Sequence, residues 1–348
     1  MEKTIAVVIN YNSGAPMIKR CVDSILEQTI AKEKKENLAI IFVDNHSSDK
    51  EGLDYMHENY DNDSSVVIIS NTENRGYAKA ANQGIRMALG RDAKWVSIVN
   101  PDVIFEPNYF EEGIKCMEKD GKIAAVSGKI LKYDLKNEKK TNMIDSAGLF
   151  AFRNRRIIDN GQGKIDEGQF EAAKEVFGVS GSCPLYRLAA LENVKVMNEY
   201  FDEDFFMYKE DIDLSWRFLL YGWKNFYCPG AVAYHVRGTG VYPRFSTKEI
   251  IKLRKHLSKF QKYYSFRNQN LMEKKNGLWG NYISDFGPII LKKLMLIPYL
   301  IFFEPNLIKA YFSSLKTLPS TLSKRKIIMQ NKKLSAKEMK KWFKKKPE

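Results

Sequence analysis

The stretch TIAVVI at Thr4–Ile9, which runs directly into the polar turn at 10–12, decides the fold of this chain. Short runs of β-branched and apolar residues are typical of strands that are buried on both faces. Further strands of this kind are predicted at Leu38–Val43, Val66–Ser70 and Trp95–Val99, with helices between them at Pro16–Leu26, Gly52–Tyr60 and Tyr77–Leu89. This regular alternation of strand and helix predicts an α/β fold with a mostly parallel, doubly wound sheet.

Polar residues follow each of these four predicted strands. They are Asn10 and Asn12, then Asp44, then 71–74, and finally Asn100 and Asp102. In open sheets of this type, ligands bind at the carboxyl ends of the strands. One such residue could simply form a turn or cap a helix. Polar side chains at four strand ends together indicate a binding site.

Two further patterns suggest the chemistry of that site. Asn100-Pro101-Asp102 presents a carboxylate at the sheet edge where a cation could bind, although such a triplet alone also forms ordinary turns. Glu210-Asp211-Ile-Asp213 places three carboxylates at the start of a predicted helix that extends to Leu220. Acids in a first helical turn also complement the helix dipole, but three exceed that need. His235 follows a predicted strand and becomes a metal-ligand candidate only together with Asp102.

Charge divides the chain into two parts. The net charge is +14 for the 348 residues, and residues 246–348 hold 24 basic and 6 acidic residues. The basicity therefore belongs to the last hundred or so residues, while the first part is slightly acidic. We expect two regions: a catalytic domain at 1–245 and a basic, amphipathic helical region at 246–348. Such a region could meet anionic lipid, nucleic acid or an acidic partner, but no nucleic-acid-binding motif accompanies the charge.

The basic region also contains a dense apolar run. LMLIPYLIFF at Leu294–Phe303 is too short to span about 30 Å of hydrocarbon. A basic amphipathic helix is predicted at Lys248–Tyr264, and lysines flank the apolar run, which favours helices lying in the interface of an anionic membrane. The alternative is that these helices only pack on the catalytic domain and expose a basic face to water.

The cysteines and the amino terminus bear on location. Cys21, Cys116, Cys183 and Cys228 are far apart and form no CxxC motif, so we expect reduced, packed thiols rather than a disulfide framework or a zinc site. The first residues contain no signal-peptide-like apolar segment. We expect a cytoplasmic protein, bound peripherally to the inner face of the cell membrane.

Seven ordered motifs resemble the family 2 glycosyltransferases with a GT-A fold, and among them the bacterial rhamnosyltransferase-like branch. The resemblance spans roughly residues 4–240. The motifs are VVINYNS at 7–13, VDNHSSD at 43–49, NTENRGYAKAANQGI at 71–85, VNPDV at 99–103, GVSGSCPLYR at 178–187, FDEDFFMYKEDIDLSWR at 201–217 and CPGAVAYHVRGTG at 228–240.

The resemblance implies a role for each candidate residue. The nucleotide sugar is expected to contact Asn10, Tyr11, Asn12, Asp44, Gly76, Asn82, Asn100 and Asp102. Asp44 would accept a hydrogen bond from a uracil or thymine ring. Asp102 matches the last position of the DxD motif, whose first Asp is here Asn100, and would hold Mn²⁺ or Mg²⁺ together with His235. Asp211 would be the general base, and Glu210, Asp213 and Arg217 would orient it or bind the acceptor.

The implied reaction is a single displacement with inversion at the anomeric carbon. The sub-branch implies L-rhamnose from dTDP-rhamnose as the donor sugar and a polyprenyl-diphosphate-linked saccharide as the acceptor, in the synthesis of a cell-surface polysaccharide. A UDP-hexose or UDP-N-acetylhexosamine donor is the alternative within the same fold. A sugar-1-phosphate nucleotidyltransferase would need a Gly-rich basic signature that TIAVVINYNSGAP lacks. An inactive membrane scaffold conflicts with the joint presence of Asp44, Asp102, Asp211 and His235.

Overall fold

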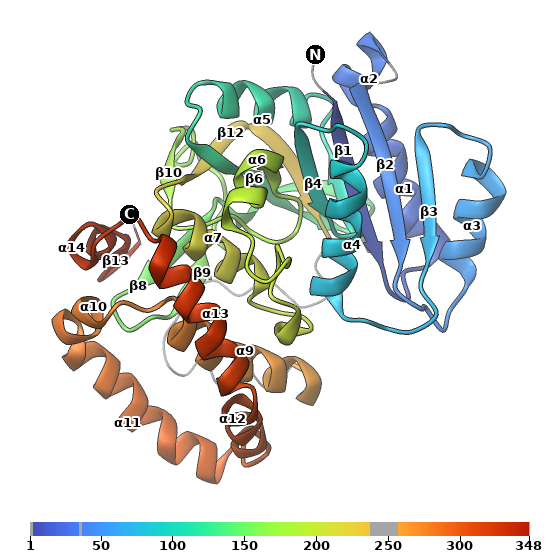
Figure 1. Ribbon diagram of the computed structural model, residues 1–348. Helices are drawn as coiled ribbons and strands as arrows, with labels where there is room; N and C mark the ends of the chain where they lie inside the picture. Colours follow the sequence, from blue (N-terminus) through green and yellow to red (C-terminus); the bar gives the residue numbers. More distant parts are fainter. Residues whose placement is uncertain (1–2, 35–36, 237–256, 348) are drawn as a thin grey trace.

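The computed structural model of the protein describes residues 3–34, 37–236 and 257–347. Figure 1 shows a twisted sheet with helices on both faces, and a group of helices, α9 to α13, at one end of it. The predicted domain boundary at 245/246 lies outside the described residues. So do the first residues of the helix predicted at Lys248–Tyr264 and the end of the seventh motif.

The first hundred residues form the predicted strand–helix repeats. Their order is β1 (Thr4–Asn10), α1 (Ala15–Leu26), α2 (Thr29–Glu33), β2 (Leu38–Asp44), α3 (Glu51–Tyr60), β3 (Val66–Ser70), α4 (Tyr77–Leu89) and β4 (Trp95–Val99). β1 pairs in parallel with β2 and β4, and β2 pairs in parallel with β3. The predicted α/β architecture is confirmed.

Both faces of β1 are covered, which explains why its sequence is apolar throughout rather than alternating. Ile5 and Val7 belong to the same core as the alanines of α4, whereas Ala6 and Val8 pack with the apolar face of α1. Gly84 lets α4 approach closely, because a Cβ atom there would lie 2.2 Å from Cγ1 of Val7. The sheet therefore lies between two helical layers.

The second part of the domain continues the sheet with mixed pairing. Its strand order is β10-β12-β6-β11-β4-β1-β2-β3, and β11 runs antiparallel to both β4 and β6. The repeating pattern of the first hundred residues did not predict this mixed half. Its elements are β5 (Val103–Phe105), α5 (Tyr109–Glu118), β6 (Ile123–Asp134), β7 (Lys139–Ser146), β8 (Leu149–Phe152), β9 (Ile157–Asp159), β10 (Lys174–Val176), β11 (Leu185–Arg187), α6 (Leu188–Val194), the 3-10 turn η2 (Glu203–Phe205), α7 (Glu210–Leu220) and β12 (Lys224–His235).

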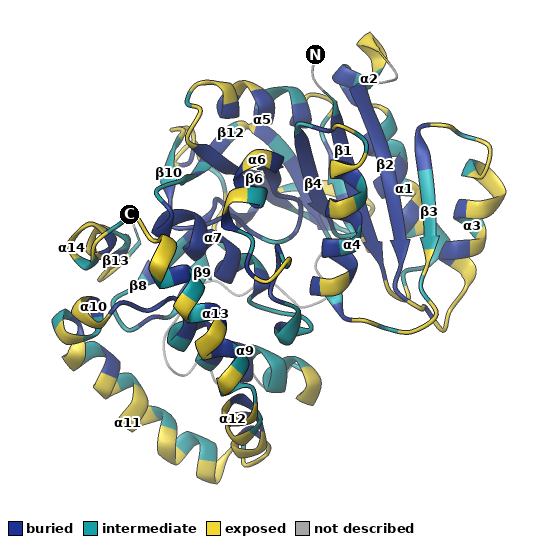
Figure 2. Ribbon diagram, in the orientation of Figure 1, coloured by how far each residue is buried: buried dark blue, intermediate teal, exposed yellow. Residues whose placement is uncertain are grey.

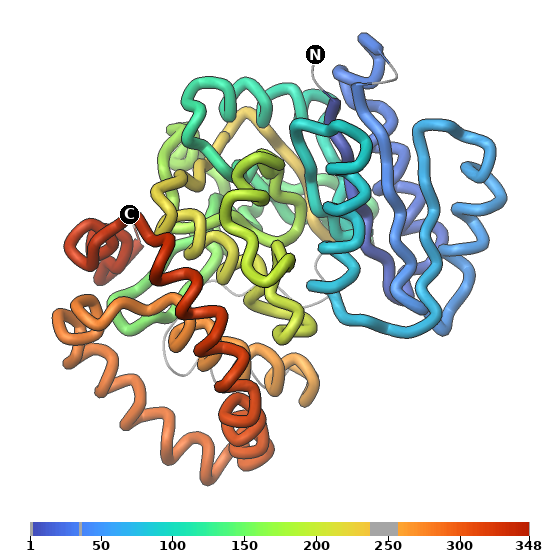
Figure 3. Tube along the Cα trace, viewed as in Figure 1, coloured from blue at the N-terminus to red at the C-terminus, as the bar shows by residue number. Residues whose placement is uncertain are grey.

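The C-terminal region returns to the catalytic domain. It consists of α9 (Lys259–Asn276), α10 (Trp279–Ser284), α11 (Phe286–Phe302), α12 (Asn306–Lys316), α13 (Leu318–Asn331), α14 (Ala336–Met339), the 3-10 turn η3 (Lys340–Trp342) and β13 (Phe343–Lys344). β13 pairs with β8 in a small second sheet, as the red end of the tube in Figure 3 shows beside β8. The buried and exposed colours of Figure 2 separate these helices: α9 and α13 bury one side, whereas α11 and α12 are mostly exposed.

A buried network of charges joins α9 and α13 to the catalytic domain. Asp202, in the segment before η2, is paired with Lys275 of α9 and Lys324 of α13, and all three side chains are at most 4% exposed. Lys275 also contacts Asp213 of α7 at 2.9 Å. Removing one member of such a network would leave a buried charge without a partner, which is strongly destabilising. The C-terminal helices are therefore structurally coupled to α7.

The structure corrects the expectation of four reduced thiols. Cys116 of α5 and Cys228 of β12 form a disulfide across 112 residues of sequence, while Cys21 and Cys183 are free and buried. The prediction failed for this pair because the packing of α5 against β12 is a long-range contact. The spacing of the cysteines along the chain contains no sign of it.

Candidate active site

A pocket of about 510 Å³ lies at the carboxyl ends of the central strands. Asn100 enters it from the end of β4, His235 from the end of β12, and Asp211 from the start of α7. Gly181 contributes backbone from a loop of small residues, and Gln261 contributes from α9. Segments that are up to 188 residues apart along the chain, from Tyr77 to Ser265, thus form one cavity.

Asp211 is held by the backbone on one side of this pocket. Its Oδ2 atom accepts a hydrogen bond of 3.0 Å from the N–H of Gly181. A side chain at Gly181 would collide with this carboxylate, because a Cβ atom there would lie 2.9 Å from Oδ2. The loop of small residues around Gly181 therefore positions the candidate base.

The segment before α7 has an unusual backbone. Phe206, Tyr208 and Lys209 all have positive φ angles, between 63° and 75°. Such conformations cost free energy for residues with side chains and persist only where surrounding contacts enforce them. Asn268 of α9, which is fully buried, supplies those contacts: its Nδ2 atom lies 2.8 Å from the carbonyl oxygens of Phe205, Met207 and Tyr208. Sequence analysis missed Asn268, since no motif marks it.

Glu210 and Asp211, at the start of α7, have higher pKa values than ordinary surface carboxylates. Burial, reinforced by the charge of Asp211, raises the pKa of Glu210 to about 8. Burial also raises the pKa of Asp211, although the N–H groups of Ile212 and Gly181 and the charge of Lys209 counteract it. Oε2 of Glu210 is buried and has no hydrogen-bond partner among the described residues. A pair of neighbouring acids with raised pKa values suits proton transfer near neutral pH.

His235, which also lines this pocket, connects two carboxylates. Its Nδ1 atom lies 2.9 Å from Asp145 Oδ2, and its Nε2 atom lies 3.2 Å from Asp102 Oδ1. Burial lowers the pKa of His235, but the charges and hydrogen bonds of Asp102 and Asp145 outweigh this and raise it to about 9. Asp145 fixes the orientation of the ring, as carboxylates do behind metal-bound histidines. Sequence analysis missed Asp145, which lies in β7 without a recognisable motif.

Asp102 and His235 are suited to hold a divalent cation. Within the described residues, no group of three or more His, Cys, Asp or Glu side chains is arranged to hold a metal ion. Cations that act on phosphates often take only one or two protein ligands and complete their coordination with phosphate oxygens and water. One carboxylate oxygen and one imidazole nitrogen 3.2 Å apart fit that pattern. Binding would require His235 to lose its proton.

The ends of β1 and β2 are joined by a network of side chains. Nδ2 of Asn10 donates to Asp44 Oδ1 at 2.8 Å, and both the N–H and the hydroxyl of Ser47 bind the Asp44 carboxylate. Asp44 is fully buried, so in this structure its oxygens organise the turn. A direct contact with a nucleobase would need this turn to open. Sequence analysis missed Ser47, although it lies inside the quoted motif VDNHSSD.

The other predicted donor-binding residues have different surroundings. Tyr11 is 52% exposed at the rim, and Asn12 Oδ1 accepts from the N–H of Ser48 at 2.8 Å. Gly76 has a φ of 79° and abuts Phe206, so a side chain there would collide with that ring. Asn82 is fully buried and bonds both backbone polar groups of Phe201 at 2.8 Å. These bonds fasten the segment before η2, and the expectation that Asn82 lines the nucleotide stays a prediction.

Asp213 and Arg217 also lie away from the cavity. Both are buried, neither lines the pocket, and Arg217 Nε lies 3.2 Å from Asp213 Oδ2. Asp213 further accepts from Nδ2 of Asn276 in α9 at 2.7 Å. Arg217 therefore supports a carboxylate of α7, and the expectation that Asp213 orients the base or binds acceptor hydroxyls stays a prediction.

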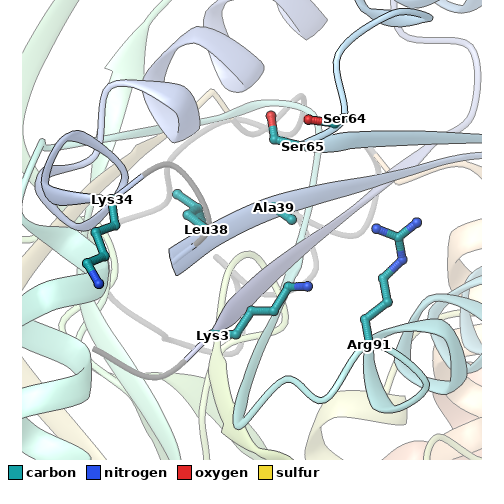
Figure 4. A pocket seen from close by; sticks show the side chains of 7 residues that line it. All are labelled: Lys3, Lys34, Leu38, Ala39, Ser64, Ser65 and Arg91. Atoms are coloured by element: carbon teal, nitrogen blue, oxygen red, sulfur yellow. The ribbon is translucent and has the colours of Figure 1, made fainter.

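A second hollow, of about 540 Å³, lies at the opposite edge of the sheet. Figure 4 shows that Lys3, Lys34 and Arg91 surround it, together with Ser64 and Ser65. It lies at the amino ends of β1 and β2, and its lining within the described residues includes no carboxylate or histidine. Although it is slightly larger, it offers neither a base nor metal ligands, so the candidate chemistry belongs to the pocket at the carboxyl ends.

Comparisons with known proteins agree with this geometry. The chain is 26% identical over 246 residues to "N-acetylglucosaminyl-diphospho-decaprenol L-rhamnosyltransferase" of Mycobacterium tuberculosis, covering 66% of this chain and 74% of that protein. It is 22% identical over 270 residues to an N-acetylglucosaminyltransferase of Azorhizobium caulinodans, covering 73% of this chain and 63% of that protein.

Solved structures show the same fold. A structure of GalNAc-T7 with UDP, GalNAc and Mn²⁺ has a TM-score of 0.56 at 13% identity, covering 78% of this chain and 51% of that chain. The mannosyltransferase PcManGT of Pyrobaculum calidifontis, in complex with GDP-Man and Mn²⁺, has a TM-score of 0.51 at 16% identity, covering 98% and 87%. Both likenesses support the GT-A architecture. The model of the family "Glycosyl transferase family 2" matches residues 5–195, more than half of the chain, and the protein therefore belongs to that family of glycosyltransferases.

Proposed function

We propose that the protein transfers a sugar, with inversion, from a nucleotide diphosphate sugar to a hydroxyl group of a lipid-linked saccharide. The observation that carries this proposal is the placement of Asp211: a carboxylate with a raised pKa, fixed by a backbone N–H, that shares one pocket with Asn100 and His235. A general base and candidate cation ligands near one pocket are what this reaction needs.

In the proposed reaction, Asp211 accepts the proton of the acceptor hydroxyl as its oxygen attacks the anomeric carbon. The bond between that carbon and the diphosphate oxygen breaks, and its electron pair leaves with the nucleoside diphosphate. Attack from the face opposite the leaving group inverts the anomeric centre. Asp102 and His235 would hold Mn²⁺ or Mg²⁺, which supplies positive charge to neutralise the diphosphate. Glu210, protonated at neutral pH, donates a hydrogen bond to the acceptor.

For the donor, we propose dTDP-L-rhamnose, with a UDP-N-acetylhexosamine as the second candidate. The mycobacterial relative is named for L-rhamnosyl transfer, while the Azorhizobium relative is named for transfer of N-acetylglucosamine. For the acceptor, we propose a polyprenyl-diphosphate-linked saccharide, since the mycobacterial relative is named for a diphospho-decaprenol acceptor. The product would be part of a cell-surface polysaccharide.

We further propose that α11 rests in the interface of an anionic membrane on the cytoplasmic side. No helix in the described residues is long and apolar enough to cross a bilayer. Yet Leu291, Leu294 and Phe302 of α11 are between 60% and 76% exposed, and Lys293 lies beside them. A contiguous exposed apolar surface flanked by lysines is typical of a helix lying in a lipid headgroup layer.

The donor proposal is tested by measuring release of nucleoside diphosphate from dTDP-rhamnose and UDP-GlcNAc, each with Mn²⁺, with Mg²⁺ and with EDTA. We expect slow hydrolysis of one donor, dependent on the cation and increased by an acceptor saccharide. If no donor is turned over faster by the protein than by its Asp211→Asn variant, the proposed function is wrong.

The membrane proposal is tested by sedimentation with vesicles that contain phosphatidylglycerol. The wild-type protein should sediment and be released by high salt, and the variant Leu294→Glu/Phe302→Glu should stay in the supernatant. Leu135→Glu is a matched control, because Leu135 is also exposed, at 41%, but belongs to the catalytic domain. Equal sedimentation of all three proteins would contradict the proposal.

A further inference from the structure

A cleft of about 360 Å³ lies beside the active-site pocket, and neither the motifs nor the proposed reaction uses it. It is bounded by α9, by α11 and by the turn between β8 and β9. Ile157, Lys209 and Ser265 line both this cleft and the active-site pocket. The two cavities therefore adjoin, with Lys209 standing between the cleft and the candidate base Asp211.

The cleft is strongly basic. Arg156, Lys209, Lys292 and Lys293 line it, and Glu273 is the one acidic residue in the part of its lining that the structure describes. Glu273 is already engaged, because its Oε1 atom accepts from Gln269 at 2.7 Å and lies 3.4 Å from Lys292. Burial lowers the pKa of Lys209, and the nearby positive charge of Lys292 adds to this effect against the opposing influence of Asp211 and Asp159. An anion in the cleft would relieve the repulsion between these cations.

The cleft also has apolar lining. Ile289 and Leu296 of α11 line it together with Lys292 and Lys293 of the same helix. Ile289 and Lys293 also line a further hollow of about 380 Å³, whose other walls include the aromatic rings of Trp279 and Phe286. Other apolar side chains of α11, such as Leu294, are exposed. A cleft with cationic and apolar lining therefore joins the pocket of Asp211 to α11.

We infer that this cleft, hereafter the basic cleft, binds the diphosphate of an amphiphilic acceptor, whose saccharide reaches the active-site pocket and whose hydrocarbon chain lies along α11. This inference rests on the proposed function and adds the acceptor's binding site to it. Phosphate groups are recognised by clustered Lys and Arg side chains through charge-assisted hydrogen bonds. The donor diphosphate has its own candidate site at Asp102 and His235, so the basic cleft serves the second substrate.

Binding of simple probes tests the chemistry directly. We would titrate the full chain with farnesyl diphosphate, with inorganic diphosphate and with farnesol. Farnesyl diphosphate should bind most tightly, since it alone combines charge with a hydrocarbon chain. The variant Lys292→Gln/Lys293→Gln should bind it about tenfold to a hundredfold more weakly, as expected for the loss of charge-assisted contacts. Lys309→Gln/Lys316→Gln on α12 is the control, because both lysines are exposed and neither lines the basic cleft.

Three outcomes would overturn the inference. Equal weakening by the α12 control would show general attraction to a basic surface, and inorganic diphosphate binding as tightly as farnesyl diphosphate would show a free-phosphate site. A rise in the KM of the nucleotide sugar, rather than of a prenyl-diphosphate-linked acceptor, would assign the basic cleft to the donor. The single variant Lys293→Gln is measured as well, because a substitution at this solvent-exposed residue should leave folding intact.

The inference and the proposed function fail in different ways. If the wild-type protein turns over no nucleotide sugar at all, the proposed function falls. If the wild-type protein transfers sugar to a prenyl-diphosphate-linked acceptor and the variant Lys292→Gln/Lys293→Gln does so with an unchanged acceptor KM, only the inference falls. We expect that KM to rise about tenfold in the variant, while transfer to the same saccharide without a diphosphate shows the same KM in both proteins.

Discussion

Two side-chain networks of the catalytic domain, here called the strand-end wall and the ionic wall, are held in place by different interactions. In the strand-end wall, at the ends of β1 and β2, amide and hydroxyl groups of Asn10 and Ser47 surround the carboxylate of Asp44. In the ionic wall, on the α7 side, acids of the catalytic domain are paired with Lys275 and Lys324 of the C-terminal helices. The strand-end wall joins neighbouring strand ends, whereas the ionic wall joins segments that are far apart in the sequence.

This difference concerns how each wall depends on the rest of the chain. The hydrogen bonds of the strand-end wall do not involve the C-terminal helices. The ionic wall joins α7, which begins beside the candidate base, to α9 and α13. The catalytic domain and the basic region consequently share one buried network of charges.

The largest effect is expected from Asp211→Asn. The substitution keeps the shape of the side chain but removes its ability to accept a proton, so transfer should fall by about 10²–10⁴-fold. Nucleotide affinity, measured by titration with the nucleoside diphosphate, should remain. Asp102→Asn should show the reverse balance, with weaker cation-dependent nucleotide binding. Equal loss of nucleotide binding and turnover in Asp211→Asn would contradict the assignment of Asp211 as the general base.

The next largest effect concerns the ionic wall. Lys275→Met leaves Asp202 and Asp213 buried without one of their partners, so the free energy of unfolding should fall by about 3–5 kcal/mol. Chemical denaturation monitored by circular dichroism measures this change. Lys316→Met on the exposed surface of α12 is the matched control and should have little effect. A loss below about 1 kcal/mol for Lys275→Met would mean that α9 does not hold α7 in place.

The next, smaller effect concerns the pH dependence of stability, to which Asp202 and Glu210 should contribute with opposite signs. Burial opposes ionisation of Asp202, but the charges of Lys275 and Lys324 dominate and lower its pKa below the usual value of 3.8, so its contribution to stability is present above that pH and lost as the pH falls. Glu210 behaves oppositely: its pKa is raised from 4.5 to about 8, so stability declines as the pH rises between these values. Glu210→Gln should remove that decline, which amounts to at most about 1.4 kcal/mol of unfolding free energy per pH unit.

The pH profile is measured as the free energy of unfolding from pH 3 to pH 9 in wild-type protein and in the Glu210→Gln variant. The two curves should converge in acid, where Glu210 is protonated in both the folded and the unfolded chain. They should diverge above about pH 5, with the variant the more stable protein. Parallel curves over the whole range would show that Glu210 ionises normally.

The smallest effect is expected at the strand-end wall. Ser47→Ala removes hydrogen bonds to Asp44 and to the N–H of Asn12, and should cost about 1 kcal/mol of stability. Raising the salt concentration should leave this cost unchanged, because the lost contacts do not depend on ion pairing between surface charges. Thermal unfolding in low and high salt tests both statements. A cost that disappears in high salt would show that this wall is electrostatic as well.

Sequence reasoning located the elements whose signals lie next to each other along the chain. The strand ends at Asn10, Asp44 and Asn100, and the helix start near Asp211, were recognised because a strand or helix signal stands directly beside each of them. The structural contacts of Asn82 with Phe201 could not be predicted, because they join segments 119 residues apart. Sequence reasoning also missed Asn268, which contacts the strained segment before α7 across 60 or more residues.

By itself, the sequence determined the α/β repeat, because apolar strands and amphipathic helices bury their surfaces in only a few arrangements. It also determined which strand ends carry polar groups and that the last third is basic. Only the tertiary structure decided the mixed half of the sheet, the disulfide between Cys116 and Cys228, and the partnership of Asp202 with Lys275 and Lys324. These depend on contacts between distant segments, and no pattern within a single segment specifies which distant residue will meet it.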